Sequence, residues 1–151
     1  MAKERKTIEI VTIKQVKNDV LRMEHGPTVR SPEDAANILF KYLEGADREH
    51  MVVMCLNTKN QVNRIESISI GSLNSSIVHP REIYKSAILS NAASIILGHN
   101  HPSGDPNPSR EDIEVTKRLV EAGNILGIEV LDHVIVGDTD RFYSLKQEGL
   151  I

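Results

Sequence analysis

Two histidines separated by a single residue are the first feature of the sequence that could do chemistry. His99 and His101 follow directly on the apolar run ASIILG, and Asp112 lies eleven residues after the second histidine. Alternate residues of a strand face the same side, so both imidazoles can approach one metal ion. A strand, a loop and a helix that fold back on one another can bring the Asp112 carboxylate to the same point. Two histidines and one carboxylate leave a fourth zinc position open, which is typical of catalytic zinc sites.

Hydrolysis at such a site needs two further groups. Zinc lowers the pKa of a bound water to about 7, so hydroxide forms at neutral pH. A general base must accept the proton, and a donor must stabilise the developing oxyanion. Ser109 supplies a hydroxyl close to Asp112, and Glu49 begins the segment EHMVVMCL, which can run beside ASIILG as a neighbouring strand. Ser109 and Glu49 are therefore the candidate catalytic residues.

Structural roles can explain the same residues without a metal. A pair of histidines at a strand end can form a polar rim. The pattern Ser-x-x-Asp is also typical of a helix start, where Ser109 would cap the first turn and Asp112 would lie near the positive end of the helix dipole. Both interpretations of Ser109 can hold together, because a cap fixes the direction in which the hydroxyl points.

Helical and extended patterns alternate along the rest of the chain. Helices that start at a capping residue or a proline are predicted over 31–44, from Pro80 onward, and over 109–126. Strands are predicted for TIEIVTIKQV (a strand or an extended arm), EHMVVMCL, QVNRIESISIGS, ASIILG, IEVLDHVIVG and FYSLK. EHMVVMCL and QVNRIESISIGS would form a hairpin. This alternation predicts an α/β or α+β fold with a mixed sheet, in one domain over residues 31–151 after an N-terminal arm of residues 1–30.

Composition and charge narrow the function classes. The 151 residues suit one domain, and the net charge of −3 argues against a surface built to wrap nucleic acid. The single cysteine, Cys55, cannot form a disulfide within the chain and lies in an apolar run, which favours a buried thiol and a reducing compartment. No apolar run is long enough for a membrane span or a signal peptide, so a cytoplasmic location without a membrane partner is expected.

The joint spacing of these residues resembles a known zinc motif. His-x-His, seven residues, Ser, two residues and Asp is similar to the pattern of the JAMM, or MPN-plus, metallopeptidases. The longer stretch HNHPSGDPNPSREDIEVTKRL, with LNSSIVHPREIYKSAI before it and LGIEVLDHVIVG after it, resembles the bacterial RadC family from about Ser31 to the C-terminus. Asn100 matches the RadC branch, whereas many peptidases of the wider family have Ser or Thr there. The resemblance implies a JAB/MPN fold, a mixed β-sheet flanked by helices, that binds one Zn²⁺.

The resemblance also implies roles for individual positions. The family's metal ligands correspond to His99, His101 and Asp112. The serine that helps to stabilise the oxyanion corresponds to Ser109. The family's general-base glutamate begins the strand after the first helix, which here selects Glu49.

Several other residues compete for these roles. Glu44 should end the first helix and Glu66 should lie within the second arm of the hairpin, so Glu49 fits the role of base best. Asp105 could be a ligand, but it sits among turn-forming residues, where capping a turn is favoured. His79, in VHPRE, could line the site, but a hydrogen-bonded histidine at a helix entry is favoured.

The remaining histidines are predicted to be structural or exposed. His133 lies within a predicted strand and is expected to be a structural histidine whose polar groups are hydrogen-bonded, with Asp132 as a candidate partner. His25 and His50 have no partner in the sequence and are expected to face solvent. His50 should point to the opposite side of its strand from Glu49.

The sequence supports two functions of different class. The first is a zinc-dependent hydrolase of the metallopeptidase type, which cleaves an amide or isopeptide bond of a peptide or protein substrate and could act as a homodimer. The second is a DNA repair or recombination accessory protein with a structural metal site, for which a basic face is expected. The acidic balance counts against the second. So does the N-terminal region, because longer RadC proteins carry a helix-hairpin-helix region where this sequence has about thirty residues. A catalytically silent scaffold usually loses ligands, and this sequence keeps the whole set.

Overall fold

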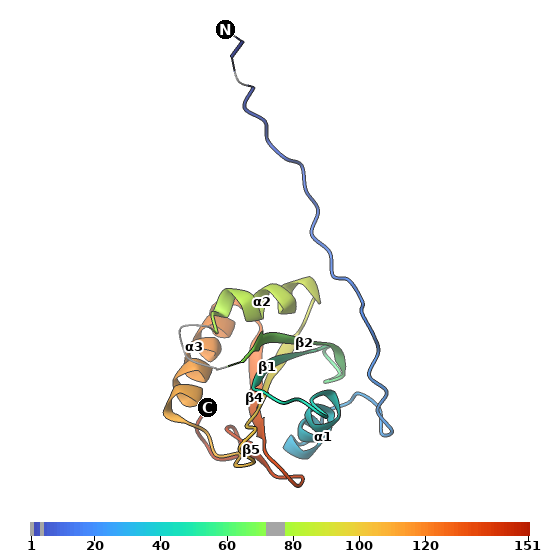
Figure 1. Cartoon of the computed structure of the whole chain (residues 1–151), viewed down its shortest axis with the longest axis vertical. Coiled ribbons are helices and arrows are strands. Elements are labelled where there is room, and N and C mark those ends of the chain that lie inside the picture. Colours follow the sequence, from blue (N-terminus) through green and yellow to red (C-terminus); the bar gives the residue numbers. More distant parts are fainter. Residues whose placement is uncertain (1, 4, 72–77) are drawn as a thin grey trace.

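A mixed β-sheet lies between helices in the computed structural model, which describes residues 2–3, 5–71 and 78–151 (Figure 1). The helices in this part of the chain are α1 (Pro32–Tyr42), α2 (Pro80–Leu89) and α3 (Arg110–Leu126). The strands are β1 (His50–Leu56), β2 (Val62–Ile70), β3 (Ser94–Asn100), β4 (Glu129–Val136) and β5 (Phe142–Ser144). Residues 72–77, which include the end of QVNRIESISIGS and the start of LNSSIVHPREIYKSAI, lie outside the described residues.

The described strands form one sheet in the order β2-β1-β3-β4-β5. β1 pairs antiparallel with both β2 and β3, whereas β3 and β4 run parallel and are joined through α3. β5 pairs antiparallel with β4 at the other edge. The predicted hairpin and the predicted mixed sheet are therefore confirmed. β3, the strand that leads to the two histidines, lies at the centre of the sheet and is buried at every residue.

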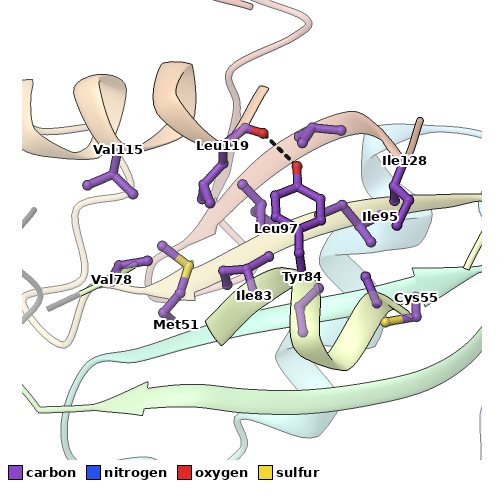
Figure 2. Packing of buried hydrophobic residues seen from close by; sticks show 13 residues of the cluster. Met51, Cys55, Val78, Ile83, Tyr84, Ile95, Leu97, Val115, Leu119 and Ile128 are labelled. Atoms are coloured by element: carbon purple, nitrogen blue, oxygen red, sulfur yellow. Dashed lines mark hydrogen bonds between the residues drawn. The ribbon is translucent and has the colours of Figure 1, made fainter. Parts of the chain in front are cut away.

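Helices cover both faces of the sheet, and the side chains of β1 are apolar on both faces. Met51, Val53 and Cys55 belong to a cluster packed with α2 and α3 (Figure 2), while Val52 and Met54 pack with α1. Successive residues of a strand point to opposite faces, which explains the division. Burial raises the pKa of the Cys55 thiol, so this residue is an inert core side chain, as the sequence predicted.

Tyr84 joins α2 to α3 within the cluster of Figure 2. Its side chain is buried, and its hydroxyl donates a 2.5 Å hydrogen bond to the carbonyl oxygen of Leu119. A Cβ at position 123 would lie 2.5 Å from the same hydroxyl oxygen, so the lack of a side chain at Gly123 lets the two helices approach closely here. Burial raises the pKa of Tyr84 to about 12.

Capping residues define where the helices begin, as predicted. The hydroxyl groups of Ser31 and Ser109 accept backbone N–H groups at the starts of α1 and α3. α1 ends at Tyr42, slightly before the predicted end near Glu44, because the chain turns there and reaches Gly45 at φ +78°. No helix in the described part of the chain is long and apolar enough to cross a membrane.

The N-terminal arm extends away from the sheet (Figure 1). Residues 5–20, which include TIEIVTIKQV, are exposed and form no strand. The Gln15 side chain donates a 2.9 Å hydrogen bond to the hydroxyl of Ser90, which caps the end of α2. The arm therefore contacts the side of the molecule that carries α2.

Candidate metal centre

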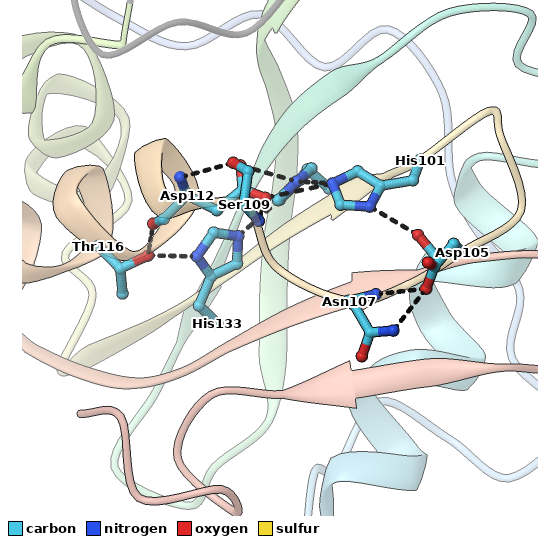
Figure 3. Close-up of polar contacts among 8 residues, drawn as sticks. His101, Asp105, Asn107, Ser109, Asp112, Thr116 and His133 are labelled. Carbon is cyan, nitrogen blue, oxygen red and sulfur yellow. Dashed lines mark hydrogen bonds and ion pairs between the residues drawn. The ribbon is translucent and has the colours of Figure 1, made fainter.

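Three predicted metal ligands meet at the end of β3. The Nε2 atoms of His99 and His101 lie 2.8 Å apart, and each lies 3.3 Å from an oxygen of the Asp112 carboxylate (Figure 3). These distances are shorter than twice the usual zinc–nitrogen bond of about 2.0–2.1 Å, so one ion can contact all three groups. Within the described residues, no second group of three or more metal-ligating side chains gathers in this way.

β3 and the loop after it place the two histidines. His99 is fully buried on the strand, while His101 follows it and donates its backbone N–H to the Val136 carbonyl oxygen at 3.0 Å. The loop turns at Gly104, which has φ +93° and lies so close to Asp138 that a Cβ would meet its carboxylate at 2.5 Å. The positive φ favours glycine, a Cβ would also displace the Asp138 side chain, and the turn starts the return of the chain toward α3.

A capping box at the start of α3 orients Asp112. Its backbone N–H donates to the Ser109 hydroxyl oxygen at 3.0 Å, and the Ser109 backbone N–H donates to Asp112 Oδ2 at 2.8 Å. The same Oδ2 atom faces the Nε2 atom of His101. The predicted cap is therefore confirmed, and it points the carboxylate at the histidines, so the cap and a metal site are compatible.

The ring nitrogen of His101 that faces away from the carboxylate has a backbone partner. Nδ1 lies 2.8 Å from the Asp105 carbonyl oxygen, which can only accept, so Nδ1 carries the hydrogen of the neutral ring. In this neutral form Nε2 presents a lone pair toward Asp112. The Asp105 side chain accepts from the backbone and side-chain N–H groups of Asn107, which confirms the predicted turn cap (Figure 3).

The charges of the site suit a cation. Burial acts to raise the pKa of Asp112, but the rings of His101 and His99, when protonated at Nε2, stabilise the carboxylate and outweigh it, and the pKa lies well below its ordinary value. The pKa of His101 is raised, mainly because the protonated ring donates from Nε2 to the Asp112 carboxylate, against the effect of burial and with a smaller increase from the charge of Glu49. An ionised carboxylate and two imidazoles are ligands that zinc prefers, so these residues fit a zinc ion.

Glu49 lies directly before β1, at the same end of the sheet as the histidines. β1 and β3 pair with Met51 opposite His99, and continuing this register places Glu49 opposite His101. The side chain is half-buried, and its charge is close enough to contribute to the pKa of His101.

Asn100 holds the backbone on both sides of Glu49. Its Nδ2 donates to the Arg48 carbonyl oxygen at 2.9 Å, and its Oδ1 accepts the His50 backbone N–H at 2.8 Å. The carbonyl oxygen of Glu49 accepts the Gly71 N–H at 2.8 Å. The residue between the two histidines therefore fixes the chain at the candidate base, a role that the sequence pattern did not indicate.

The competing glutamates lie elsewhere on the surface. Glu44 is exposed in the turn after α1, and Glu66 is exposed on β2, where it pairs with Val53 of β1. Glu49 is therefore the one of the three that lies at the end of the sheet where the histidines meet.

The other histidines partly follow the predictions. His79 is exposed and caps α2, with its Nδ1 atom accepting the Arg81 N–H at 3.2 Å, as expected for a helix entry. His25 is exposed, as predicted. The prediction for His50 is wrong, because its side chain is half-buried and its Nδ1 lies 3.1 Å from the Ser67 hydroxyl oxygen. The neighbouring strand β2 supplies this partner.

His133 of β4 contacts the site, although the sequence suggested only a structural role. It is fully buried, with its Nε2 atom 2.7 Å from His99 Nδ1 and its Nδ1 atom 2.6 Å from the Thr116 hydroxyl oxygen (Figure 3). Asp132, the candidate partner, accepts the backbone N–H of His133 and the hydroxyl of Ser144, while the imidazole of His133 pairs with His99 and Thr116. The pattern IEVLDHVIVG predicts a strand but not the parallel pairing that sets His133 beside β3.

A cavity of about 210 Å³ lies beside His101. Phe40 of α1 and Val136 of β4 contribute apolar walls, and Asn100 and Asp138 contribute polar groups. Of the three candidate ligands, His101 is the one that lines this cavity, which lies on the side of the sheet that α1 covers.

Most of this chain is similar in sequence to known proteins. The model of the family described as RadC-like JAB domain matches residues 29–150. A UPF0758 protein of Caldanaerobacter subterraneus is 65% identical over 122 residues, which cover 81% of this chain and 52% of the relative. One from Desulforamulus reducens is 62% identical over 123 residues (82% and 54%), and one from Bacillus cereus is 54% identical over 148 residues (97% and 65%). The chain thus spans about half the length of the first two relatives. It belongs to the RadC-like JAB domain family.

Proposed function

We propose that this domain is a zinc-dependent hydrolase of the metallopeptidase type, which cleaves an amide or isopeptide bond. The observation that carries the proposal is the convergence of the His99, His101 and Asp112 side chains at the end of β3. These residues would hold the ion. When bound there, zinc would supply a water with a pKa of about 7 and a Lewis acid for a carbonyl oxygen.

Glu49 is the proposed general base. It accepts a proton from the attacking water and delivers it to the leaving nitrogen, which requires a carboxylate beside the reacting atoms. Its position opposite His101 in the strand register and the hold of Asn100 on the adjoining backbone support this role. A fixed backbone limits the positions that the carboxylate can take.

Ser109 is the proposed donor to the oxyanion. Its oxygen accepts the Asp112 N–H in the capping box, and this bond leaves the hydroxyl hydrogen available for another acceptor. Because Ser109 is exposed and the cap orients it, the hydroxyl can donate to a negatively charged oxygen that develops on the substrate.

A peptide or protein is the proposed substrate. The cavity beside His101 has apolar walls and the carboxylate of Asp138 among its lining groups, and an extended peptide offers both apolar side chains and backbone N–H donors to such a surface. The alternative is a DNA repair or recombination accessory protein with a structural metal. The net charge of −3 argues against it, because a DNA-binding surface is usually basic.

The test is incubation of the zinc-loaded protein with a pool of peptides and isopeptide-linked peptides, followed by mass spectrometry. We expect cleavage by the parent, rates lower by about 10²–10⁴-fold in Glu49→Gln, and parental rates in Glu44→Gln, since Glu44 is exposed beyond α1. Zinc content is measured on the same preparations, which separates loss of the base from loss of the ion.

Two results would count against the proposal. Parental turnover by Glu49→Gln would show that Glu49 is not the base. A zinc-loaded parent that cleaves nothing in the pool, but binds duplex DNA with a steep dependence on salt, would favour the accessory function.

A further inference from the structure

We propose that His133 and Thr116 form a hydrogen-bond relay that fixes the tautomer of His99 and thereby directs the lone pair of its Nε2 atom at the metal position. The inference rests on the metal site of the proposed function and assigns to it two positioning residues outside the ligand set. It needs three steps, each decided by which atom can donate a hydrogen.

The relay begins at the backbone of α3. The Thr116 hydroxyl oxygen lies 2.6 Å from the carbonyl oxygen of Asp112, one turn earlier in the helix. A carbonyl oxygen can only accept, so the single hydrogen of the hydroxyl is donated to it. Toward His133, whose Nδ1 atom lies 2.6 Å away, the hydroxyl oxygen must therefore act as the acceptor.

The second step sets the hydrogen on His133. Its Nδ1 atom has to donate to Thr116 and therefore carries a hydrogen. The ring is 0% exposed, and its two nitrogens contact a hydroxyl and an imidazole, neither of which is an anion, so a charged ring would be costly. A neutral imidazole with its hydrogen on Nδ1 has a lone pair on Nε2.

The third step sets the hydrogen on His99. Its Nδ1 atom lies 2.7 Å from the Nε2 atom of His133, which carries a lone pair, so Nδ1 of His99 donates and carries the hydrogen. The other nitrogen, Nε2, then presents a lone pair toward the Nε2 atom of His101 at 2.8 Å and the Asp112 carboxylate at 3.3 Å. This is the tautomer that a metal ligand requires.

The relay also explains why a second imidazole can serve as the partner of a metal-ligating histidine. Such histidines usually donate to a carboxylate or a carbonyl oxygen, which can only accept. An imidazole is able to donate or accept, so it needs a further group to decide its direction. Thr116 decides it for His133, and through it for His99.

The decisive variant is Thr116→Val, which removes the hydroxyl and leaves a side chain of similar shape. His133 can then carry its hydrogen on Nε2 and donate to His99, which would place the hydrogen of His99 on the atom that must face the metal. Thr116→Ser retains the hydroxyl and should rescue the effect. Thr58→Val, at an exposed turn position between β1 and β2, is the matched control.

Two measurements on the purified chain test the relay. Competition with a zinc chelator should show affinity lower by about 10–100-fold in Thr116→Val, and parental affinity in Thr116→Ser and Thr58→Val. Long-range ¹H–¹⁵N spectra of the metal-free parent at neutral pH should show the ring hydrogens of His99 and His133 on their Nδ1 atoms.

The outcomes separate this inference from the proposed function. A hydrogen on His99 Nε2 in the metal-free parent, or parental zinc affinity in Thr116→Val, would overturn the relay even if the protein is a zinc hydrolase. A parent that binds no zinc would overturn the proposed function, and the tautomers in the metal-free spectra would still decide the relay.

Discussion

At the scale of single residues, Asp112 and Ser109 each have a structural contact and a candidate chemical role. Asp112 Oδ2 accepts the Ser109 N–H in the capping box and also faces His101. A helix cap is a local interaction that sequence spacing indicates, and so is an i, i+2 pair on a strand. For this reason the sequence predicted which of these side chains would meet. The two interpretations of Ser109, a helix cap and a donor to the oxyanion, both place its hydroxyl at the start of the same helix.

Replacement of Ser109 tests the cap. Ser109→Ala removes the acceptor for the Asp112 N–H and should lower the free energy of unfolding by about 1 kcal/mol. Ser109→Asn keeps a capping acceptor and should stay close to the parent. Urea unfolding of the three proteins gives the result, and an unchanged midpoint in Ser109→Ala would show that the cap does not stabilise α3.

The residues that the sequence analysis missed depend on contacts between distant segments. His133 and Thr116 are separated by 17 positions and meet only because β4 pairs parallel to β3 while α3 packs against it. Neither the strand pattern around His133 nor the helical pattern around Thr116 carries information on that pairing. A buried histidine within an apolar strand is a signal that a polar partner exists, but it does not name the partner.

At the scale of secondary structure, capping residues and apolar patterns predicted the helices and strands well. Ser31 and Ser109 begin helices as expected, and the hairpin of β1 and β2 forms. The arm was predicted less firmly, because TIEIVTIKQV has the residue types of a strand. A strand also needs a neighbour to accept its backbone hydrogen bonds, and residues 5–20 pair with no strand in the described part of the chain.

The link between β1 and β3 through Asn100 gives a second prediction. Asn100→Ala removes two hydrogen bonds to the backbone around Glu49 and should lower the free energy of unfolding by about 1–3 kcal/mol. Amide exchange at His50 should become faster. Asn63→Ala, at an exposed position of β2, is the control. Equal effects of the two variants would show that the hydrogen bonds of Asn100 to the backbone around Glu49 do not stabilise the fold.

The contact of α2 with α3 through Tyr84 gives a third prediction. The pKa of Tyr84 is raised from its ordinary value of 10 to about 12 in the folded protein, so the unfolded chain loses the phenol proton first. The raised pKa reflects a contribution of the neutral, buried phenol to the free energy of unfolding. This contribution is fully present below pH 10 and is lost as the pH rises to about 12. Tyr84→Phe lacks this titration.

Urea unfolding of the parent and Tyr84→Phe between pH 8 and pH 12 measures the effect. Near pH 8 the parent should be more stable by about 1 kcal/mol, because it retains the hydrogen bond to Leu119. The difference between the two proteins should shrink above pH 10. A constant difference across this range would show that the buried phenol does not titrate as described.

At the scale of the whole molecule, the candidate metal site joins elements that are far apart in the sequence. His99 belongs to β3 and Asp112 to α3, and His133 adds β4 behind them. The order of the strands determines this meeting point, and it was not predictable from the alternation of helices and strands alone. The long RadC-like motif indicated the JAB fold because it covers several elements at once.

Removal of the metal gives a fourth prediction. An ion that binds only the folded protein stabilises it by about 2.7 kcal/mol when its free concentration is 100 times Kd. A chelator should therefore lower the Tm of the zinc-loaded parent and leave the Tm of Asp112→Ala unchanged. An identical Tm of the zinc-loaded parent with and without chelator would indicate that the ion does not bind at a folded site.

The most direct test of the central claim is the metal content of the purified protein, determined by inductively coupled plasma mass spectrometry beside His101→Ala and Asp112→Ala. We predict nearly one zinc per chain in the parent and loss of zinc in both variants, with folding of each verified by circular dichroism. Absence of zinc from the parent after reconstitution, or retention of zinc by both variants, would contradict a metal site at His99, His101 and Asp112.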